Sequence, residues 1–332
     1  MKASFLCALL LCLSYGIINC QIINGITFVA PPKSVGQEAF TRLQETHANW
    51  LCFVPYAFVK KGQTEIRFSL DKQWWGETST GINACLDLSK KTKFNAMLKP
   101  QVFVPNGWIG EIDFQTEEEW VKFEKSYETY IMAILEFAIT HNVEMFCVGT
   151  ELRLFAKKRE KFWRKLIKNI RSKYKGKLTY SANWDDYENV PFWDELDYIG
   201  VSAYFPLIDM KTPTINSLNV KWKKICAELK TYSKNTGKKI LFTEYGYLTV
   251  DHCASKTWEL ESKIQTLKIN QEAQANAFES LYQSIWNQPF FAGGFIWKWF
   301  PNGMGHEGYK DKDYDPQNKL AEAVVKKYYS QK

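Results

Sequence analysis

The sequence predicts an α/β protein that forms a single (β/α)8 barrel. Short apolar runs alternate with helical patterns along nearly the whole chain. The apolar runs are not interrupted by alternating polar residues, which is typical of parallel strands buried on both faces. The 332 residues also suffice for one such barrel, which usually takes roughly 250 residues. No linker or low-complexity tract divides the chain, so we expect one domain after a short leader.

Eight apolar runs are assigned to strands and are followed by helical patterns in nearly every case. The expected strands are 25–28, 50–54, 95–98, 145–148, 178–181, 198–203, 240–242 and 293–296. The expected helices are 35–46, 85–92, 116–141, 155–174, 220–235, 271–287 and 319–328. The third helix has the clearest start, because Thr116 is followed three residues later by Glu119, the pattern of a capping box.

The composition narrows the classes of function. The formal net charge is +7, but the densest basic stretch, residues 157–168, is interrupted by apolar residues at helical spacing. We interpret this stretch as the outer face of an amphipathic helix, so no nucleic-acid partner is expected. Aromatic residues make up 16% of the chain. Some will belong to the core, but Trp and Tyr also present flat apolar faces that suit a sugar cleft.

The first 20 residues have the pattern of an export signal. Lys2 supplies a positive charge, and residues 5–13 form an apolar run that is too short to span a bilayer. The mature domain is therefore expected to cover residues 21–332. Residues 17–20 loosely resemble a bacterial lipobox, in which Cys20 would be lipidated, although Asn19 is larger than usual there. The protein is expected to be either secreted or a membrane-anchored lipoprotein.

Eight cysteines are present, and three of them, Cys7, Cys12 and Cys20, belong to the leader. The other five are an odd and widely spaced set, so nothing demands a disulfide framework. Cys52 and Cys147 fall in expected strands and are interpreted as small buried hydrophobes. Without a CxxC pair or an HExxH motif, we expect no metal and no cofactor. We also expect a monomer.

Two glutamates end expected strands and are the strongest functional signal. Glu151 ends the run of the fourth strand and Glu244 the run of the seventh. Each run closes with the pair Thr-Glu. In a parallel barrel, residues at the carboxyl ends of strands line one mouth. Two carboxylates that face each other there are the minimum requirement for hydrolysing a glycosidic bond. The alternative is two surface carboxylates without a shared role.

At these positions the chain resembles the clan of retaining glycoside hydrolases that carry the acid/base on strand four and the nucleophile on strand seven. Within that clan it is most similar to glycoside hydrolase family 113, known for β-1,4-mannanases. The shared segments are Leu98-Lys99-Pro100, Gly149-Thr150-Glu151-Leu152, Thr243-Glu244-Tyr245-Gly246, Gly294-Phe295-Ile296-Trp297-Lys298-Trp299 and residues 315–322. The resemblance covers nearly all of the mature chain. It implies that Glu151 is the acid/base and Glu244 the nucleophile.

Further residues are expected at the substrate. The resemblance implies that Tyr204 hydrogen-bonds Glu244, the alternative being an aromatic at the barrel rim. Trp297 could form the floor under the reacting sugar, whereas Trp299 either contacts substrate or packs beneath helices. Lys99 either donates to a sugar hydroxyl or is a solvated charge at the rim. The remaining expected sugar contacts are Asn183, Trp184, Trp74 and Trp75.

The chain departs from the pattern of its relatives at two positions. Thr150 stands where much of the clan has an asparagine that holds the 2-hydroxyl of the sugar, and Gln101 stands where a histidine is expected. These changes leave the sugar open. The predicted function is hydrolysis of a β-linked polysaccharide or oligosaccharide, with β-1,4-mannan favoured. A β-glucanase, xylanase or exo-β-glycosidase of the same clan is an alternative, as is a non-catalytic glycan-binding barrel.

Overall fold

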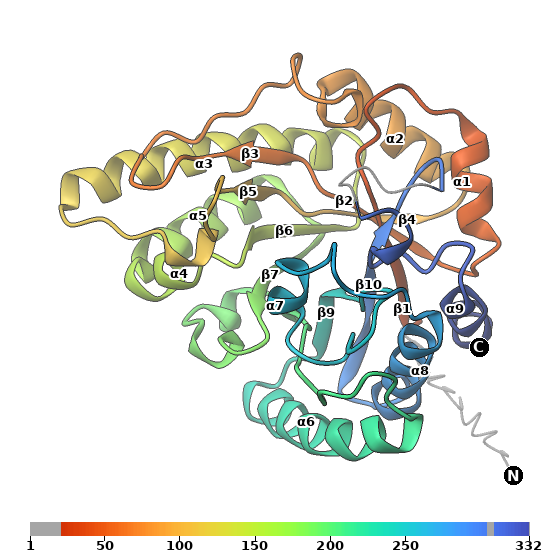
Figure 1. The fold of residues 1–332 in the computed structure, drawn as a ribbon. Helices are drawn as coiled ribbons and strands as arrows, with labels where there is room; N and C mark the ends of the chain where they lie inside the picture. Colours follow the sequence, from red (N-terminus) through yellow and green to blue (C-terminus); the bar gives the residue numbers. More distant parts are fainter. Residues whose placement is uncertain (1–20, 304–308, 332) are drawn as a thin grey trace, which may run out of the picture.

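The computed structural model describes residues 21–303 and 309–331, and there it confirms the predicted barrel. Eight parallel strands close on themselves in the order β1, β2, β4, β6, β7, β8, β9, β10. Helices surround them (Figure 1). The barrel strands are β1 (Ile23–Phe28), β2 (Trp50–Phe53), β4 (Asn95–Leu98), β6 (Met145–Thr150), β7 (Lys177–Asn183), β8 (Ile199–Ser202), β9 (Ile240–Tyr245) and β10 (Phe291–Trp299). Every strand carries its chain from one end of the barrel to the same mouth.

The barrel interior is filled by apolar side chains. The cluster inside includes Met97, Met145, Leu241 and Phe295, with the thiols of Cys52 and Cys147 among them. The prediction that these two cysteines are small buried hydrophobes is therefore confirmed. Gly25 makes room for Phe295, because a Cβ at this glycine would lie 2.3 Å from the phenyl ring.

The outer layer consists of amphipathic helices, and a second, larger apolar cluster lies between them and the strands. The helices are α1 (Gln37–Gln44), α2 (Ser79–Lys91), α3 (Glu117–Thr140), α4 (Arg153–Lys158), α5 (Glu160–Lys173), α6 (Ile215–Thr236), α7 (Thr257–Glu261), α8 (Gln271–Leu281) and α9 (Leu320–Tyr329). Helix α3 begins with the capping box that the sequence predicts at Thr116. Helix α5 buries Trp163 and Leu166 and turns its basic residues outward, as expected.

The helix predicted at 271–287 is found as α8 and the π-helical turn that continues it, Tyr282–Trp286. Three other helix expectations were wrong. The predicted helix 155–174 is divided at Arg159 into α4 and α5. The helix predicted from residue 85 begins at Ser79, behind the N-cap Thr78. The helix predicted from residue 220 begins at Ile215, behind the N-cap Thr214. These boundaries depend on tertiary packing, which the periodicity of apolar residues does not report.

Two short strands were not predicted and extend one side of the barrel mouth. Strands β3 (Tyr56–Phe58) and β5 (Gln101–Phe103) pair with each other in parallel, directly after barrel strands β2 and β4. Pro55 and Pro100 separate each extension from its barrel strand. Because proline cannot donate a backbone hydrogen bond, it weakens the ladder there, but the Gln101 N–H still donates to the Pro55 carbonyl at 3.0 Å and the register is unchanged beyond it. The sequence does not reveal that the pairing continues.

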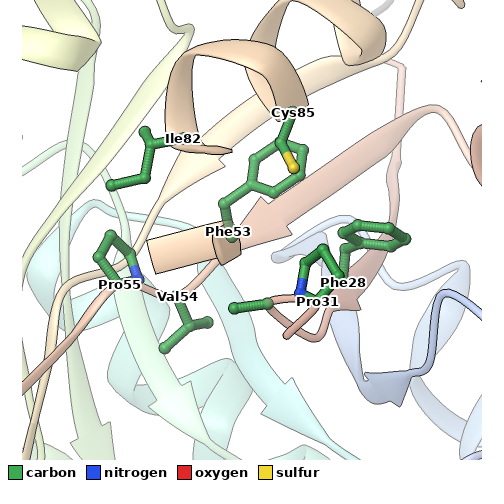
Figure 2. Close-up of a pocket in the computed structure, with 9 residues that line it drawn as sticks. Phe28, Pro31, Phe53, Val54, Pro55, Ile82 and Cys85 are labelled. Carbon is green, nitrogen blue, oxygen red and sulfur yellow. The ribbon is translucent and has the colours of Figure 1, made fainter. Parts of the chain in front are cut away.

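A small apolar pocket lies where the ends of β1 and β2 approach α2 (Figure 2). Its lining includes Phe28, Phe53, Ile82 and Cys85, and its volume is about 10 Å³. That volume holds at most one water molecule, so the pocket is a packing defect rather than a ligand site. Burial raises the pKa of the Cys85 thiol to about 12, which keeps this cysteine unreactive at neutral pH.

The five cysteines within the described residues are all free thiols. The structure of that same part of the chain has no helix that is both long and apolar enough to cross a membrane. The predicted export signal at residues 1–20, with Cys20 at its end, lies outside the described residues.

Candidate active site

An open cleft of about 1270 Å³ crosses the mouth of the barrel at the carboxyl ends of the strands. Both predicted carboxylates, Glu151 and Glu244, line it. They come from strands β6 and β9, which are separated by β7 and β8 in the barrel. The two glutamates therefore share one cleft.

Glu151 is positioned by a sharp turn at the end of β6. The pairing of β6 with β7 shifts register just before this point, and the Glu151 N–H donates to the Ser181 carbonyl at 2.7 Å. The backbone of Glu151 has a φ of 56°, in the left-handed region that side chains other than glycine rarely adopt. Backbone strain of this kind is concentrated at functional sites, where the surroundings hold it in place.

The carboxyl of Glu151 lies in a site that favours its protonated form. Burial and the nearby negative charge of Glu244 raise the pKa of Glu151. The indole N–H of Trp108 opposes this shift by donating to Glu151 Oε2 at 3.0 Å. A carboxyl that holds its proton near neutral pH can act as a general acid.

The surroundings of Glu244 differ from those of Glu151, because a cation and a hydrogen-bond donor contact its two carboxylate oxygens. The ammonium of Lys99 forms an ion pair with Oε1, and the hydroxyl of Tyr204 donates to Oε2 at 2.9 Å. Burial and the adjacent carboxylate raise the pKa of Tyr204, so the phenol keeps the proton that it donates. Hydrogen bonds of this kind stabilise the ionised form of a carboxyl.

The pairing of Lys99 with Glu244 is fully internal. Lys99 is 0% exposed and Glu244 is 4% exposed. Burial is the largest single influence on the pKa of Lys99 and lowers it, but the charge and hydrogen bond of Glu244, together with smaller contributions from Cys52 and Cys147, outweigh burial, and the net shift is upward. Lys99 Nζ also lies 5.3 Å from the ring centroid of Trp297, so Trp297 and Glu244 share one cation.

Five of the eight expected substrate contacts line the cleft: Trp297, Tyr204, Asn183, Trp184 and Trp74. Three do not. Lys99 is neither a solvated rim charge nor a lining residue, because its side chain is buried against Glu244. Trp299 is 1% exposed in the core between barrel and helices, and the partly buried Trp75 packs against that same core. The register between β1 and β10 shifts between Ile296 and Trp299, so strict alternation of side chains does not hold there. Trp297 packs at the barrel interior and lines the cleft, whereas Trp299 joins the cluster between the strands and the helices.

Sequence reasoning missed several lining residues. Trp108 and Arg153 form one unit beside Glu151, with the guanidinium 4.7 Å from the indole centroid. Arg153 also forms an ion pair with Asp185. Trp258 on α7 lines the cleft from a segment without a clear pattern. Only Arg153 lies close enough to Glu151 in sequence to have been found. The fold brings the other three lining residues, Trp108, Asp185 and Trp258, to the cleft from distant segments.

A further carboxyl, Glu77, lies in the wall of the cleft and is 8% exposed. Gln73 donates a hydrogen bond to it. Burial nevertheless raises the pKa of Glu77 to about 7. Between pH 4.5 and 7 the folded protein thus keeps a proton that the unfolded chain releases, so stability falls as pH rises.

Glu77→Gln is therefore expected to stabilise the protein at alkaline pH. The gain in the free energy of unfolding should be close to zero at pH 4, rise through the interval and level off at about 3 kcal/mol above pH 7. Urea unfolding of both proteins from pH 4 to pH 8.5 measures it. Glu118→Gln, at an exposed position on α3, is the control. A difference independent of pH would show that Glu77 ionises as freely in the folded protein as in the unfolded chain.

Trp108→Phe should move the alkaline limb of the pH–rate profile to higher pH. The substitution removes the indole N–H that lowers the pKa of Glu151. Without that donor the proton on Glu151 is held more tightly, so the acid form persists to higher pH. Profiles of kcat/KM on a substrate that requires protonation of its leaving group measure the limb. A shift to lower pH would mean that Trp108 does not stabilise the ionised form of Glu151.

The described residues contain no group of three or more His, Cys, Asp or Glu side chains placed to hold a metal ion.

A family model for glycoside hydrolase family 113 matches residues 32–319. Among solved structures, the family 113 β-mannanase AaManA from Alicyclobacillus acidocaldarius in complex with ManMIm is similar, with a TM-score of 0.81 and 25% identity over 93% of this chain and 97% of that one. A complex of a family 113 β-1,4-mannanase has a TM-score of 0.78 and 26% identity over 94% of this chain and 100% of that one. A Faecalibacterium prausnitzii β-glucuronidase shares the fold, at 13% identity and a TM-score of 0.64 over 93% of this chain and 49% of that one.

No protein of curated function gives a significant match. The family model nevertheless covers most of the chain, and the fold and the cleft agree with it. The chain belongs to glycoside hydrolase family 113, and the protein is a glycoside hydrolase.

Proposed function

We propose that this protein hydrolyses β-1,4-linked mannan by double displacement, with Glu244 as the nucleophile and Glu151 as the acid/base. The observation that carries the proposal is the contrast between two carboxyls in one cleft. Glu244 meets an ammonium and a phenol hydroxyl, whereas burial and a neighbouring negative charge raise the pKa of Glu151. In such a pair, the carboxyl paired with a cation serves as the nucleophile, and the carboxyl with the raised pKa serves as the acid.

In the first step, a carboxylate oxygen of Glu244 forms a bond to the anomeric carbon. The glycosidic bond breaks, its electron pair goes to the leaving oxygen, and Glu151 supplies the proton that this oxygen takes up. In the second step, Glu151, now a carboxylate, accepts a proton from water, and the hydroxide oxygen displaces Glu244. The sugar is released with its original anomeric configuration, and both carboxyls return to their starting states.

Lys99 is expected to influence both steps. Its ammonium stabilises the carboxylate of Glu244 before attack and again as Glu244 departs. Because Lys99 has no exposed surface, water does not weaken this ion pair. The same burial makes the cation costly to leave unpaired, which favours return of the free carboxylate after each turnover.

The preference for mannan rests on the relatives and on the form of the cleft. The similar family 113 structures are β-mannanases, and the open cleft, with a volume of about 1270 Å³, has room for several sugar rings. Gln101, the departure from the expected histidine, lines the cleft with a side-chain oxygen that accepts no hydrogen bond within the described protein. That oxygen is buried, so a sugar hydroxyl would satisfy it only after the Gln101 side chain turns toward the cleft. Thr150 is 2% exposed and donates to the Pro100 carbonyl at 3.3 Å, so it supports the cleft from below.

Incubating the purified protein with a panel of β-linked polysaccharides and sizing the products tests this proposal. We expect manno-oligosaccharides from mannan or glucomannan and little release from xylan or cellulose. Hydrolysis of another β-glycan with mannan untouched would reassign the substrate and leave the carboxyl roles intact. Binding to a glycan without release of any product would favour the non-catalytic alternative.

The amino-terminal pattern supports export of the enzyme to meet a polysaccharide substrate. Lys2 and the apolar residues 5–13 make a secretory signal, and Cys20 offers a site for a lipid anchor. The amino-terminal mass of the mature protein distinguishes the two forms. A diacylglyceryl adduct on Cys20 indicates an anchored lipoprotein, and an unmodified terminus indicates a secreted one.

A further inference from the structure

The large exposed apolar side chains of the described residues fall into two groups. Those in the first group, which are all aromatic, line the cleft: Phe58, Trp74, Phe103 and Trp258. Those in the second group, which are all aliphatic, lie outside it: Val121, Met210, Val220, Ile269 and Leu320. Exposing a large aromatic ring to water is unfavourable, so its restriction to the cleft indicates a ligand with apolar faces.

Trp258 belongs to a built surface and not to a loose loop. Its indole stacks on that of Trp184, with centroids 5.8 Å apart and an interplanar angle of 16°. Phe205 holds Trp184 from the edge at 5.9 Å. Helix α7, which carries Trp258, is fixed by the buried Leu260 and by Glu261, which accepts a hydrogen bond of 2.5 Å from Tyr314. Trp258 itself remains 46% exposed.

The aromatic side chains that line the cleft occupy two different sides of the barrel mouth. Trp74, Phe58 and Phe103 follow strands β2 and β4, whereas Trp184 and Trp258 follow β7 and β9. In the closed strand order, β8 lies across the barrel from β2, so the stacked pair stands opposite the other group. A chain of sugars that crosses the cleft can therefore contact aromatic rings on both sides of the carboxyls.

Helix α7 is linked to Glu244 through Tyr314 and Tyr204, but Trp184, the less exposed member of the stacked pair, is linked to the acid. Trp184 is followed by Asp185, which pairs with Arg153, and Arg153 covers Trp108, the hydrogen-bond donor to Glu151. The opposite carboxylate, Glu244, shares its cation with Trp297. The acid protonates the leaving group and the nucleophile holds the other sugar, so the side of Glu151 receives the leaving sugars.

We propose that Trp258, stacked on Trp184, is a platform for a sugar ring of the leaving-group portion of the substrate. The inference rests on the proposed function for the direction of the chain. With aromatic contacts on both sides of the carboxyls, the enzyme binds the interior of a polysaccharide and cleaves within it. Loss of the exposed ring removes the contact on one side only.

The test compares two substrates in Trp258→Ala. β-Mannobiosyl fluoride has fluoride as its leaving group and so has no sugar that reaches the platform, whereas mannohexaose does. The ratio of kcat/KM for mannohexaose to that for the fluoride should fall roughly five- to tenfold. Trp258→Phe should recover much of the ratio, and Val220→Ala, an exposed position on α6, should keep it. Mannohexaose labelled at its reducing end should also be cut at a different bond. An unchanged ratio and an unchanged bond would overturn the platform.

Affinity electrophoresis in gels that contain galactomannan separates this inference from the proposed function. If the wild type is retarded but Trp258→Ala is not, and neither hydrolyses the galactomannan, the result supports the platform. It contradicts the proposal that the protein hydrolyses mannan. If the wild type hydrolyses a different β-glycan, the two-substrate comparison is repeated with the disaccharide fluoride and the hexasaccharide of that glycan. Equal retardation of both proteins would contradict the platform whatever the activity.

Discussion

Glu244→Gln is expected to abolish hydrolysis of every substrate, with a loss of roughly 10⁴- to 10⁶-fold in kcat. The amide cannot form the glycosyl–enzyme bond, so no leaving group, however good, restores the reaction. Glu151→Gln should behave differently. It should lose activity on mannan but retain it on aryl glycosides with good leaving groups, which need little protonation.

Azide separates the two roles further. It should accelerate Glu151→Gln, because it attacks the glycosyl–enzyme without a general base, and the product should be a β-configured azide. Glu118→Gln on α3 is the matched control for the change from carboxylate to amide at an exposed site. If azide restores Glu244→Gln with the β product while Glu151→Gln stays inactive on activated substrates, the roles of the two carboxyls are exchanged.

Lys99→Met is expected to reduce both stability and turnover. The substitution leaves the Glu244 carboxylate buried without its cation, which should cost roughly 3–5 kcal/mol in the free energy of unfolding at neutral pH. Turnover should fall roughly 10²- to 10³-fold, as when one preorganised electrostatic contact is lost. Lys99→Arg keeps the charge and should lose less of both. Urea unfolding and kcat on an activated aryl glycoside are the measurements.

A thermodynamic cycle distinguishes the ion pair from simple packing. If Lys99 acts through Glu244, Lys99→Met should destabilise the Glu244→Gln background much less than the wild type, because no buried carboxylate is left unpaired. Lys122→Met, which removes the partner of exposed Glu118, should leave the free energy of unfolding almost unchanged. Equal losses in both backgrounds would show that Lys99 contributes only its volume.

The barrel and both carboxyls were predictable because their signals are local. Each strand is an uninterrupted apolar run, and Glu151 and Glu244 follow two of them directly. The position of a residue at a strand end does not say whether its side chain reaches the mouth. Lys99 follows β4 yet is buried beneath the cleft, and Trp299 lies in the core two residues beyond Trp297, which lines the cleft.

The remaining features of the site depend on contacts between distant segments. Trp108 and Glu151 are 43 residues apart in sequence and meet only because the segment beyond β5 folds over the end of β6. Trp258 reaches Trp184 from a different barrel connection. The basic stretch at 157–168 shows the opposite case, since the amphipathic pattern of its larger part, in α5, sufficed to place the charged face toward solvent.

Trapping the covalent intermediate tests the double-displacement chemistry most directly. A 2-deoxy-2-fluoro-β-mannosyl fluoride destabilises the second transition state while its fluoride still leaves readily, so the glycosyl–enzyme should accumulate. Peptide mapping by mass spectrometry should then find the added sugar on the peptide that contains Glu244. A sugar attached to Glu151, or hydrolysis that releases the α-configured product without any adduct, would contradict the assignment of Glu244 as the nucleophile.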